Sequence, residues 1–484
     1  MNRKKFIFNM TGLGFIALHD NFKLRSQTIP CSSNYVIEQF EDKGLAHFSY
    51  AIMGGKEIIV IDPQRNPQVY YDFAQKNNSV ITGVIETHPH ADFVSSHLEI
   101  HQTLNVPIYA SSLTRSKYPL KRLDDGDKIK LTDQVGLRVL YTPGHAPDHI
   151  AAVLYEYEKD RAVFSGDSLF LGDVGRPDLL DFSSESNQQR RYLAAMMYDT
   201  IHQKFAKLND DVMVYPSHGA GSLCGKSIRK AASSTIGYER QFNYAFEKRT
   251  KEEFVDLLLS DQPHIPKYFA YDIDLNNNGA SELKSSLAKI RFMPKNYQPE
   301  SRAIVIDTRP EAFFKASYLS NAINIQGSGQ FESWLGTLVE PASKFYLVAG
   351  DEQSLQTVIK KAAAIGYEAN VQGAFVYDAG DGNKLSAFDS GSFDPAENKY
   401  TYLDVRTLTE IKKQPVFRNS INIPLQELIE RVSEIPSGMP VLVHCGSGYR
   451  SATAVSILKS AMPSVEVYDL GSKVSQFMSG GSIK

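Results

Sequence analysis

The sequence predicts an α/β protein built from several domains, and two observations support this. In the first half of the chain, four predicted strands each lead into a loop that carries a histidine or an aspartate. In the second half, one α/β pattern occurs twice at a spacing of about 97 residues. A chain of 484 residues is long enough for about two to four domains, each able to bury its own core.

Composition excludes some classes of partner. The formal net charge is −3, and 42% of the residues are hydrophobic. Without a global excess of basic residues, we expect neither nucleic acid nor an anionic membrane as a general partner. There is no apolar run of about 18 residues, so we expect no membrane span. Three cysteines, at 31, 224 and 445, are too few for a disulfide framework and direct attention to thiol chemistry.

Residues 1–33 are interpreted as an N-terminal leader or signal-like extension. A basic run at 3–5 precedes a mostly apolar stretch at 6–18, as in a secretory or twin-arginine signal. Asn9 and Thr11 interrupt that stretch, and no small-residue cleavage site follows it. The sequence therefore leaves a cytoplasmic and a periplasmic location both open.

Strand and turn signals begin at residue 35. Gly54 and Gly55 separate two segments rich in β-branched and apolar residues, which predicts a hairpin. The predicted strands of this first domain are 49–53, 57–62, 80–86, 137–141, 162–165 and 212–215. Because the last four lead into polar loops, we expect a site at one edge of a sheet.

Two copies of one α/β domain follow the first domain. The segments that repeat are Ile-Val-Ile-Asp-Thr-Arg at 304–309 with Tyr-Leu-Asp-Val-Arg at 402–406, and Asn-Ala-Ile-Asn-Ile at 321–325 with Asn-Ser-Ile-Asn-Ile at 419–423. We place the first copy at 298–383 and the second copy at 398–484. Residues 274–286, rich in Asn and Ser, are predicted to be a connector rather than core, and 389–397 to link the copies.

A constellation of histidines and aspartates suggests a metal site in the first domain. His88 and His90, separated by one residue on a loop, are able to share one ion, with Asp92 nearby. The other candidates follow the ends of predicted strands: His145, Asp167 and His218. On these motifs the chain resembles the metallo-β-lactamase superfamily over residues 34–268, and the resemblance implies an αββα sandwich.

Phe93 departs from the family pattern His-x-His-x-Asp-His, whose last histidine binds the second metal of the binuclear members. This departure counts against a two-zinc hydrolase. The remaining donors are two imidazoles and one carboxylate, as in non-haem Fe(II) oxygenases: His88, His145 and Asp167. In the persulfide dioxygenase branch the matching positions bind a single iron, so the resemblance implies one Fe²⁺ per chain, with zinc as the alternative. The residues that would then orient ligands or bound water are His90, Asp92 and His218.

Two further segments resemble persulfide dioxygenases. Leu-Gly-Asp-Val-Gly-Arg-Pro-Asp-Leu at 171–179 is similar to a loop whose arginine helps to hold the thiol substrate, which implies that role for Arg176. The segments at 219–226 and 237–240 resemble the fused, multidomain members, which implies that Cys224 lies near the iron and relays sulfur. Each residue has a simpler alternative: Arg176 as a surface ion-pair residue, and Cys224 as a small buried apolar residue.

Cys445 lies on a loop between a predicted strand and a predicted helix. Backbone N–H groups at a helix start converge on such a cysteine and favour its thiolate, and Arg450 adds positive charge. Four residues separate Cys445 from Arg450, whereas the tyrosine phosphatase pattern has five. The loop resembles that of rhodanese, which implies a pocket for a sulfane sulfur. Asp-Val-Arg at 404–406 and Asn-Ile-Pro at 422–424 match rhodanese too, although the usual Gly-His-Ile is absent.

The first copy lacks this chemistry. Alignment of the copies puts Gly350 at the position of Cys445 and Leu355 at that of Arg450. Without a thiol, residues 298–383 cannot carry sulfur covalently. We interpret them as a degenerate rhodanese domain, kept for packing, oligomerisation or ligand placement, and we expect the chain to form a homo-oligomer.

The order of the three domains resembles bacterial fusions of persulfide dioxygenase, pseudo-rhodanese and rhodanese. The resemblance implies a sulfide-detoxifying enzyme that oxidises a low-molecular-weight thiol persulfide with O2 to sulfite at iron, and forms thiosulfate from sulfite and a persulfide on Cys445. Two alternatives stay open: a zinc-dependent, glyoxalase II-like thioester hydrolase fused to a sulfurtransferase, and a non-catalytic persulfide sensor whose Cys224 and Cys445 trap sulfur. Glutathione, coenzyme A and bacillithiol all fit as thiol carriers.

Overall fold

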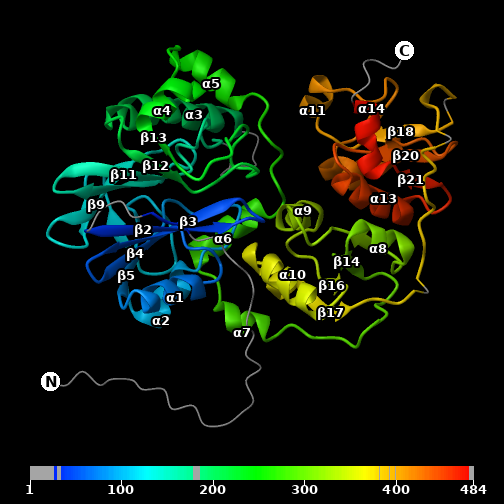
Figure 1. Ribbon diagram of the computed structural model, residues 1–484, viewed down its shortest axis with the longest axis horizontal. Coiled ribbons are helices and arrows are strands. Elements are labelled where there is room, and N and C mark those ends of the chain that lie inside the picture. The colour runs from blue at the N-terminus through cyan, green and yellow to red at the C-terminus, as the bar shows by residue number, and fades with distance from the viewer. Residues whose placement is uncertain are drawn as a thin grey trace, which may run out of the picture.

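A computed structural model of the chain describes residues 27–29, 34–177, 186–380, 382–391, 393–397 and 399–478 (Figure 1). Apart from 27–29, the predicted leader lies outside the described residues, and so do residues 178–179 of the segment that contains Arg176. Within the described ranges, no helix is both long and apolar enough to cross a membrane.

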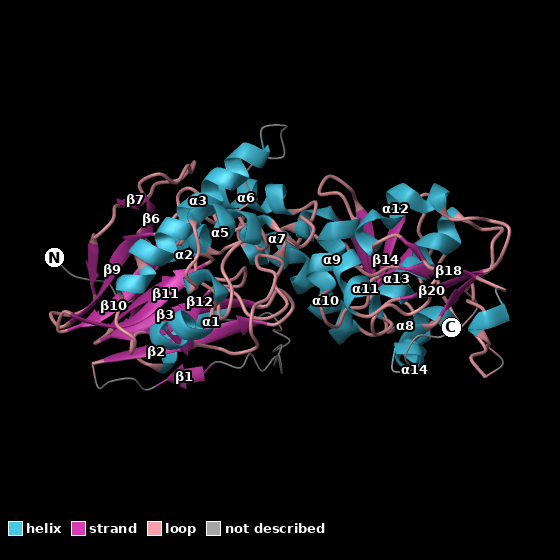
Figure 2. Ribbon diagram, turned by 90° about the horizontal axis from the view of Figure 1, so that it is seen from above, coloured by secondary structure: helices cyan, strands magenta, loops and turns pink. Residues whose placement is uncertain are grey.

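Two β-sheets stack on one another in the first domain, with helices on their outer sides (Figure 1); seen from above in Figure 2, the strands of the two sheets overlap. The first sheet follows chain order: β1 (Gln27–Ile29), β2 (Tyr35–Asp42), β3 (His47–Gly54), β4 (Glu57–Ile61), β5 (Val80–Ile85), β6 (Ile108–Ser111) and β7 (Lys121–Leu123). The second sheet has the order β13-β12-β11-β10-β9-β8. Its strands are β8 (Lys128–Lys130), β9 (Val135–Tyr141), β10 (Ile150–Glu156), β11 (Lys159–Gly166), β12 (Met213–Pro216) and β13 (Ser234–Thr235).

Three apolar layers hold this sandwich together. Between the sheets, Tyr50 of the first sheet packs in one cluster with Leu154 and Phe164 of the second. The helices α1 (Gln68–Lys76) and α2 (His97–Leu104) cover the other face of the first sheet. The second sheet is covered by α3 (Ser186–Gln203) and α5 (Lys251–Leu259), with α4 (Ile236–Phe242) beside them. The predicted αββα sandwich is confirmed.

The six predicted strands of this domain correspond to β3, β4, β5, β9, β11 and β12, with ends shifted by a few residues. The long strand β10 was not predicted. Its sequence, Ile-Ala-Ala-Val-Leu-Tyr-Glu, is buried at every position because β10 lies inside the sheet between β9 and β11. A strand buried on both faces lacks the alternation of apolar and polar residues that marks a half-exposed strand.

The connector after the sandwich is more ordered than its composition suggests. It contains α6 (Phe269–Asn278) and α7 (Leu283–Leu287). The prediction that residues 274–286 stay outside any core is wrong for Asn276, which is 2% exposed. Its polar side chain is buried because it binds backbone groups of another segment, which composition alone does not reveal.

Two parallel four-stranded sheets follow, with the same strand order. In the first copy the order β15-β14-β16-β17 comprises β14 (Ile304–Asp307), β15 (Ala322–Asn324), β16 (Phe345–Ala349) and β17 (Val371–Val376), with α8 (Glu311–Ala316), α9 (Phe331–Leu338) and α10 (Glu352–Ala364). In the second copy the order β19-β18-β20-β21 comprises β18 (Thr401–Asp404), β19 (Ile421–Asn422), β20 (Val441–His444) and β21 (Val467–Asp469). Its helices are α11 (Leu408–Lys413), α12 (Leu428–Arg431), α13 (Tyr449–Ala461) and α14 (Ser475–Met478).

The repeated motifs form the same contacts in both copies. In the second copy, Arg406 binds the carboxylate of Asp404, and the Asn422 side chain donates to the carbonyl oxygens of both residues. The equivalent residues of the first copy make the same bonds: Arg309, Asp307 and Asn324. These buried polar motifs fix the turn after the first strand of each copy, which is why they recur in the sequence.

One large apolar cluster joins all three units. It includes Phe93 and Phe269 from the sandwich and its following helix, Ile359 of α10, and Leu403 of β18. Figure 1 shows α9 and α10 on the side of the first copy that faces the sandwich. The three units therefore share a common core instead of being joined by linkers alone.

Candidate metal centre and cysteine loop

A buried carboxylate anchors the loop that carries His88. Asp62, directly after β4, accepts hydrogen bonds from the N–H of Thr87 (2.8 Å) and from its hydroxyl (2.9 Å). Ser217, next to His218, donates to the same carboxylate (2.8 Å). The Thr87 hydroxyl proton is thereby used, so His88 Nδ1 must donate in its 3.0 Å contact with Thr87 Oγ1. His88 Nε2 then keeps its lone pair for a metal ion.

Three buried side chains meet near this loop, each from a different strand end: His88, His145 and Asp167. One ligand atom of each lies within 4.8 Å of the others, and His145 Nε2 is 3.4 Å from Asp167 Oδ2. His145 Nδ1 contacts the carbonyl oxygen of Arg176 at 2.8 Å. Because a carbonyl only accepts, Nδ1 carries the proton and Nε2 presents its lone pair to the group.

The atoms of this group fit a metal ion. His145 Nε2 and both carboxylate oxygens of Asp167 are buried and have no hydrogen-bond partner in the part of the chain that the structure describes. Buried polar atoms are normally paired, so three such atoms side by side indicate a binding site for a cation. Two imidazoles and one carboxylate suit iron and zinc alike.

A second buried group adjoins the first: His90, Asp92 and His218. His218 Nε2 lies 3.3 Å from Asp92 Oδ2 and 3.5 Å from Asp167 Oδ2, so the two groups are in contact. Burial alone would lower the pKa of His218, but the two carboxylates outweigh it and raise this pKa to about 9. The negative charge gathered here is balanced either by protonated histidine or by a cation.

Phe93 occupies the last position of the histidine motif. Its ring stacks on that of His47, with 3.8 Å between the centroids, and lies 4.3 Å from the ring of His90. The side chain is 1% exposed and belongs to the core cluster that joins the three units. This position therefore supplies packing and no metal ligand.

Sequence reasoning missed three polar residues of this region: His47, Asp62 and His149. His149 Nε2 accepts a hydrogen bond from the N–H of Asp167 (2.9 Å) and so fixes that segment. His47 pairs through its backbone with His218, far along the chain. Asp62 directly follows β4, and His149 lies shortly after the Pro-Gly-His motif at 143–145. Both positions could therefore have been recognised in the sequence. No local pattern marks His47.

Arg176 lies in a buried loop beside the metal group. Its N–H donates to the carbonyl oxygen of Cys224 (2.9 Å). Its guanidinium donates to the carbonyl oxygens of Leu223 (3.0 Å), Pro263 (2.7 Å) and His264 (3.3 Å). The side chain is 1% exposed, so Arg176 is no surface residue.

Cys224 is buried next to the same group. A ligand atom of Asp167, one of His218 and the Cys224 sulfur all lie within 4.8 Å of one another. Burial, reinforced by the negative charges of Asp92 and Asp167, raises the pKa of the Cys224 thiol well above its usual value. The apolar neighbours Phe170 and Ile228 pack against it.

Cys445 directly follows β20 and lies at the start of α13. Its sulfur accepts a hydrogen bond from the Gly448 N–H (3.1 Å) and is 3.7 Å from Ser451 Oγ. Gly448 has φ +108°, which a residue with a Cβ rarely adopts and which lets the loop turn toward the helix. Arg450 forms two hydrogen bonds with Glu410, of 2.7 and 2.5 Å. The loop thus combines a buried thiol, a helix-start N–H and a nearby cation.

The corresponding loop of the first copy is acidic. Gly350 follows β16 as Cys445 follows β20. The next residue, Asp351, caps α10 by accepting a hydrogen bond from the Ser354 N–H (2.8 Å). A carboxylate therefore occupies the helix start that lies beside the Cys445 sulfur in the second copy, and Leu355 offers no charge.

Comparison with known proteins matches two parts of the chain to protein families. Residues 42–218 match the model of the metallo-beta-lactamase superfamily, and residues 394–477 match that of the rhodanese-like domain. The crystal structure of a metallo-beta-lactamase from Staphylococcus aureus subsp. aureus COL is 30% identical, with a TM-score of 0.64, and the match covers 71% of this chain and 99% of that chain. The chain belongs to the metallo-β-lactamase superfamily.

Other relatives match the metallo-β-lactamase domain. Hydroxyacylglutathione hydrolase from Francisella tularensis subsp. novicida (strain U112) is 28% identical over 227 residues, which cover 46% of this chain and 79% of that protein. The crystal structure of ETHE1 from Myxococcus xanthus is 22% identical, with a TM-score of 0.42, over 50% of this chain and 97% of that chain. The two family models confirm the predicted fusion of a metallo-β-lactamase domain with a rhodanese-like domain.

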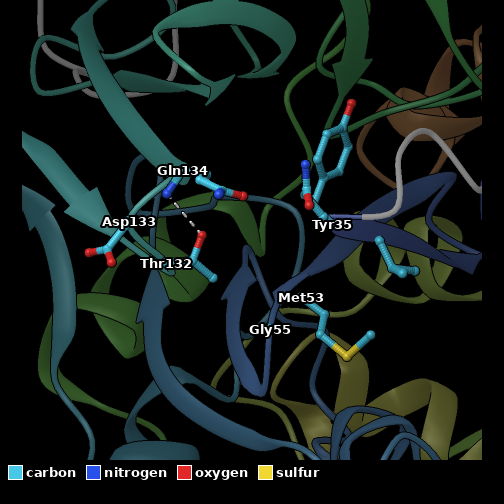
Figure 3. A pocket seen from close by; sticks show the side chains of 8 residues that line it. Tyr35, Met53, Gly55, Thr132, Asp133 and Gln134 are labelled. Carbon is cyan, nitrogen blue, oxygen red and sulfur yellow. Dashed lines mark hydrogen bonds between the residues drawn. The ribbon is translucent and has the colours of Figure 1, made fainter.

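A surface pocket of about 390 Å³ lies on the metallo-β-lactamase domain, lined in part by Tyr35, Met53 and Thr132 (Figure 3). Tyr35 pairs with Gly54 at one end of β3, whereas His47 stands at the other end. Seven residue steps of extended strand separate the two ends by roughly 23 Å. This pocket is therefore distinct from the metal centre.

Proposed function

We propose that this protein is a non-haem iron persulfide dioxygenase fused to a thiosulfate-forming sulfurtransferase. In the first reaction a low-molecular-weight thiol persulfide, O2 and water give the thiol, sulfite and two protons. In the second, sulfite removes the sulfane sulfur from a persulfide on Cys445, which releases thiosulfate and the Cys445 thiolate. The observation that carries the proposal is a three-donor metal group on the same chain as a rhodanese-like cysteine loop.

Two features favour one iron over two zincs. His88, His145 and Asp167 would provide three ligands to an iron ion, and a site with three protein ligands would leave room for substrate and O2. Phe93 stands where binuclear relatives carry a further ligand. When bound, iron would supply the redox chemistry that couples the persulfide to O2.

The protein's own part in the first reaction is to hold these donors in place. Asp62 acts through Thr87 on the ring of His88, and the Arg176 carbonyl fixes the protonated nitrogen of His145. His149 fixes the backbone of Asp167. We assign the orientation of substrate or bound water to the adjoining group: His90, Asp92 and His218.

At Cys445 the chain's own groups perform the sulfur transfer. The thiolate attacks the outer sulfur of a thiol persulfide, the S–S bond breaks, and the thiol leaves. The new persulfide anion is stabilised by the Gly448 N–H and by the charge of Arg450. Sulfite then attacks the outer sulfur, and the bond to Cys445 breaks with its electron pair on the cysteine.

Cys224 and Arg176 have supporting roles in this proposal. The closeness of the Cys224 sulfur to Asp167 and His218 supports a relay of sulfur beside the metal. The Arg176 guanidinium binds the carbonyl oxygen of Leu223, and its backbone N–H binds that of Cys224. We therefore propose that Arg176 contributes to substrate binding indirectly, by holding the 223–224 segment in place.

The second candidate function is a zinc-dependent, glyoxalase II-like thioester hydrolase fused to a sulfurtransferase. The 28% identity to hydroxyacylglutathione hydrolase favours it. So does the second buried group, which keeps three donors of a binuclear site: His90, Asp92 and His218. A non-catalytic persulfide sensor is the third candidate and predicts sulfur loading of the cysteines without O2 consumption.

Anaerobic purification with metal analysis, followed by O2 uptake after addition of glutathione persulfide, separates the three. About one iron per chain with persulfide-dependent uptake is the expected result. Two zincs with thioester hydrolysis and no uptake would establish the hydrolase instead. Persulfidation of Cys445 with neither activity would point to the sensor.

A further inference from the structure

The metal-ligand loop, residues 87–96, is held by a side chain from α6. The Asn276 amide nitrogen donates to the carbonyl oxygens of His90 and Phe93, both at 2.8 Å. Its amide oxygen accepts a hydrogen bond from the Ser95 N–H (2.9 Å). One buried asparagine therefore fixes three backbone groups on both sides of Asp92.

The first copy contacts the same loop through the C-terminal end of its helix α10. The Val94 N–H donates to the carbonyl oxygen of Ala364, the last residue of α10 (2.8 Å). The Tyr271 hydroxyl of α6 donates to the carbonyl oxygen of Gly366 (3.3 Å). Just before α6, the Tyr268 hydroxyl donates to the carbonyl oxygen of Asp92 (3.2 Å). The loop, α6 and the α10 terminus thus form one hydrogen-bonded unit.

The fit at Gly366 shows how tightly this unit is packed. A Cβ at this position would lie 2.4 Å from Leu275 Cδ1 and 3.1 Å from both Tyr271 Cε1 and Val94 Cγ2. Gly366 also has φ +69°, which favours glycine. The turn after α10 therefore contacts the metal-ligand loop and α6 so closely that an added side chain would force the Leu275 side chain to shift.

We propose that the first copy and α6 together position the metal-ligand loop: α6 acts through the Asn276 side chain, and the first copy acts through the end of α10. This deepens the proposed function and rests on its assignment of the metal group. The degenerate rhodanese domain then has a defined structural role, because it holds the loop that carries His88, His90 and Asp92 in the conformation that binds the ion.

The physical reason is preorganisation. A metal ion is bound most tightly when its ligands need no rearrangement, and groups that orient the ligands typically change metal affinity about 10- to 100-fold when they are removed. Without the Asn276 side chain, two buried carbonyls and one N–H lose their partner, and the loop must move to satisfy them.

The first test compares Asn276→Ala with Asn370→Ala. Asn370 is a matched control, because it is also buried and also donates to two backbone carbonyls, those of Pro341 and Ser343, away from the metal-ligand loop. Anaerobic titration with Fe²⁺ against a chelator, and the absorption spectrum of the Co²⁺-loaded protein, report the ligand geometry independently of activity. We expect Asn276→Ala to weaken metal binding about 10- to 100-fold and to change the Co²⁺ spectrum, and Asn370→Ala to do neither.

Equal affinities and spectra in both variants and the wild type would overturn the inference. Wild-type protein that selects two zincs would overturn the proposed function, yet the comparison between variants would still decide the inference. The two failures are therefore distinguishable.

A second pair of variants keeps the test decisive if Asn276→Ala does not fold. Gly366→Ala introduces the crowding against Val94 and α6 described above. Gly329→Ala is its control, since Gly329 also belongs to the first copy and has φ +65°, but an added Cβ there would come no closer than 3.8 Å to Tyr449. We expect weaker metal binding in Gly366→Ala alone, and equal metal binding in the two variants would contradict the inference.

Discussion

Replacing Cys445 by serine should separate the two proposed reactions. In the proposed scheme, the wild type oxidises one persulfide to sulfite and takes the sulfane sulfur from a second, so about two persulfides should be consumed for each O2. Without the thiol only the oxidation proceeds. Consumption should fall to about one persulfide for each O2, with sulfite as the product in place of thiosulfate.

The structure predicts that this substitution does little to the fold. The Cys445 sulfur is buried, and its two polar contacts are the Gly448 N–H at 3.1 Å and Ser451 Oγ at 3.7 Å. A serine hydroxyl is able to make the same contacts. We therefore expect the free energy of unfolding to change by less than about 1 kcal/mol, as measured by urea denaturation.

The assay is an oxygen electrode with parallel measurement of sulfite and thiosulfate. Gly438→Ala, at an open position of the second copy, controls for general damage to the domain. Thiosulfate at the wild-type yield from Cys445→Ser would refute the role of this cysteine. Loss of O2 uptake in Cys445→Ser alone would refute the independence of the two reactions.

Three further changes test the metal count and the buried charges. Phe93→His restores the histidine of the family pattern. When zinc is supplied, metal analysis should show a rise from one toward two ions per chain. An unchanged number of ions would show that position 93 does not control the metal count. Asp404→Ala removes the carboxylate that binds the buried Arg406 at 2.6 Å. The free energy of unfolding, measured by urea denaturation, should then fall by about 3–5 kcal/mol. Partial burial would raise the pKa of Glu410, but the hydrogen bonds and the charge of Arg450 outweigh this effect and lower the pKa of Glu410 from 4.5 to about 2. A lowered pKa means that the stabilisation is present above pH 4.5 and is lost as the pH falls toward 2. Since 40% of the Glu410 side chain is exposed, it contributes at most about 1 kcal/mol, and Glu410→Gln should remove this acid dependence in urea titrations at several pH values.

The candidate ligands were predictable because of where they stand along the chain. His88, Asp167 and His218 each follow a strand within a few residues, and the loops after these strands meet at one place. The cysteine loop was predictable for a similar local reason. A short strand, a glycine-containing turn and a helix are contiguous in sequence, so their geometry depends little on distant residues.

The support of the metal loop was not predictable. Asn276 binds Ser95 across 181 residues of chain, and its own segment has the composition of a polar connector. His47 reaches Phe93 and His218 only after β3 has paired within the sheet. Such long-range contacts leave no periodic signal, because they depend on which surfaces meet after folding.

By itself, the sequence determined which chemical groups are available: two imidazoles and a carboxylate at strand ends, a phenylalanine where the family has a ligand, a thiol at 445 and none at 350. Only the tertiary structure decided how those groups are held. The hydrophobic effect is not directional and stabilises any apolar surfaces that pack well together. Sequence motifs therefore cannot specify that one core contains Phe93, Ile359 and Leu403. That shared core brings the first copy against the metal-ligand loop and makes the three units one molecule.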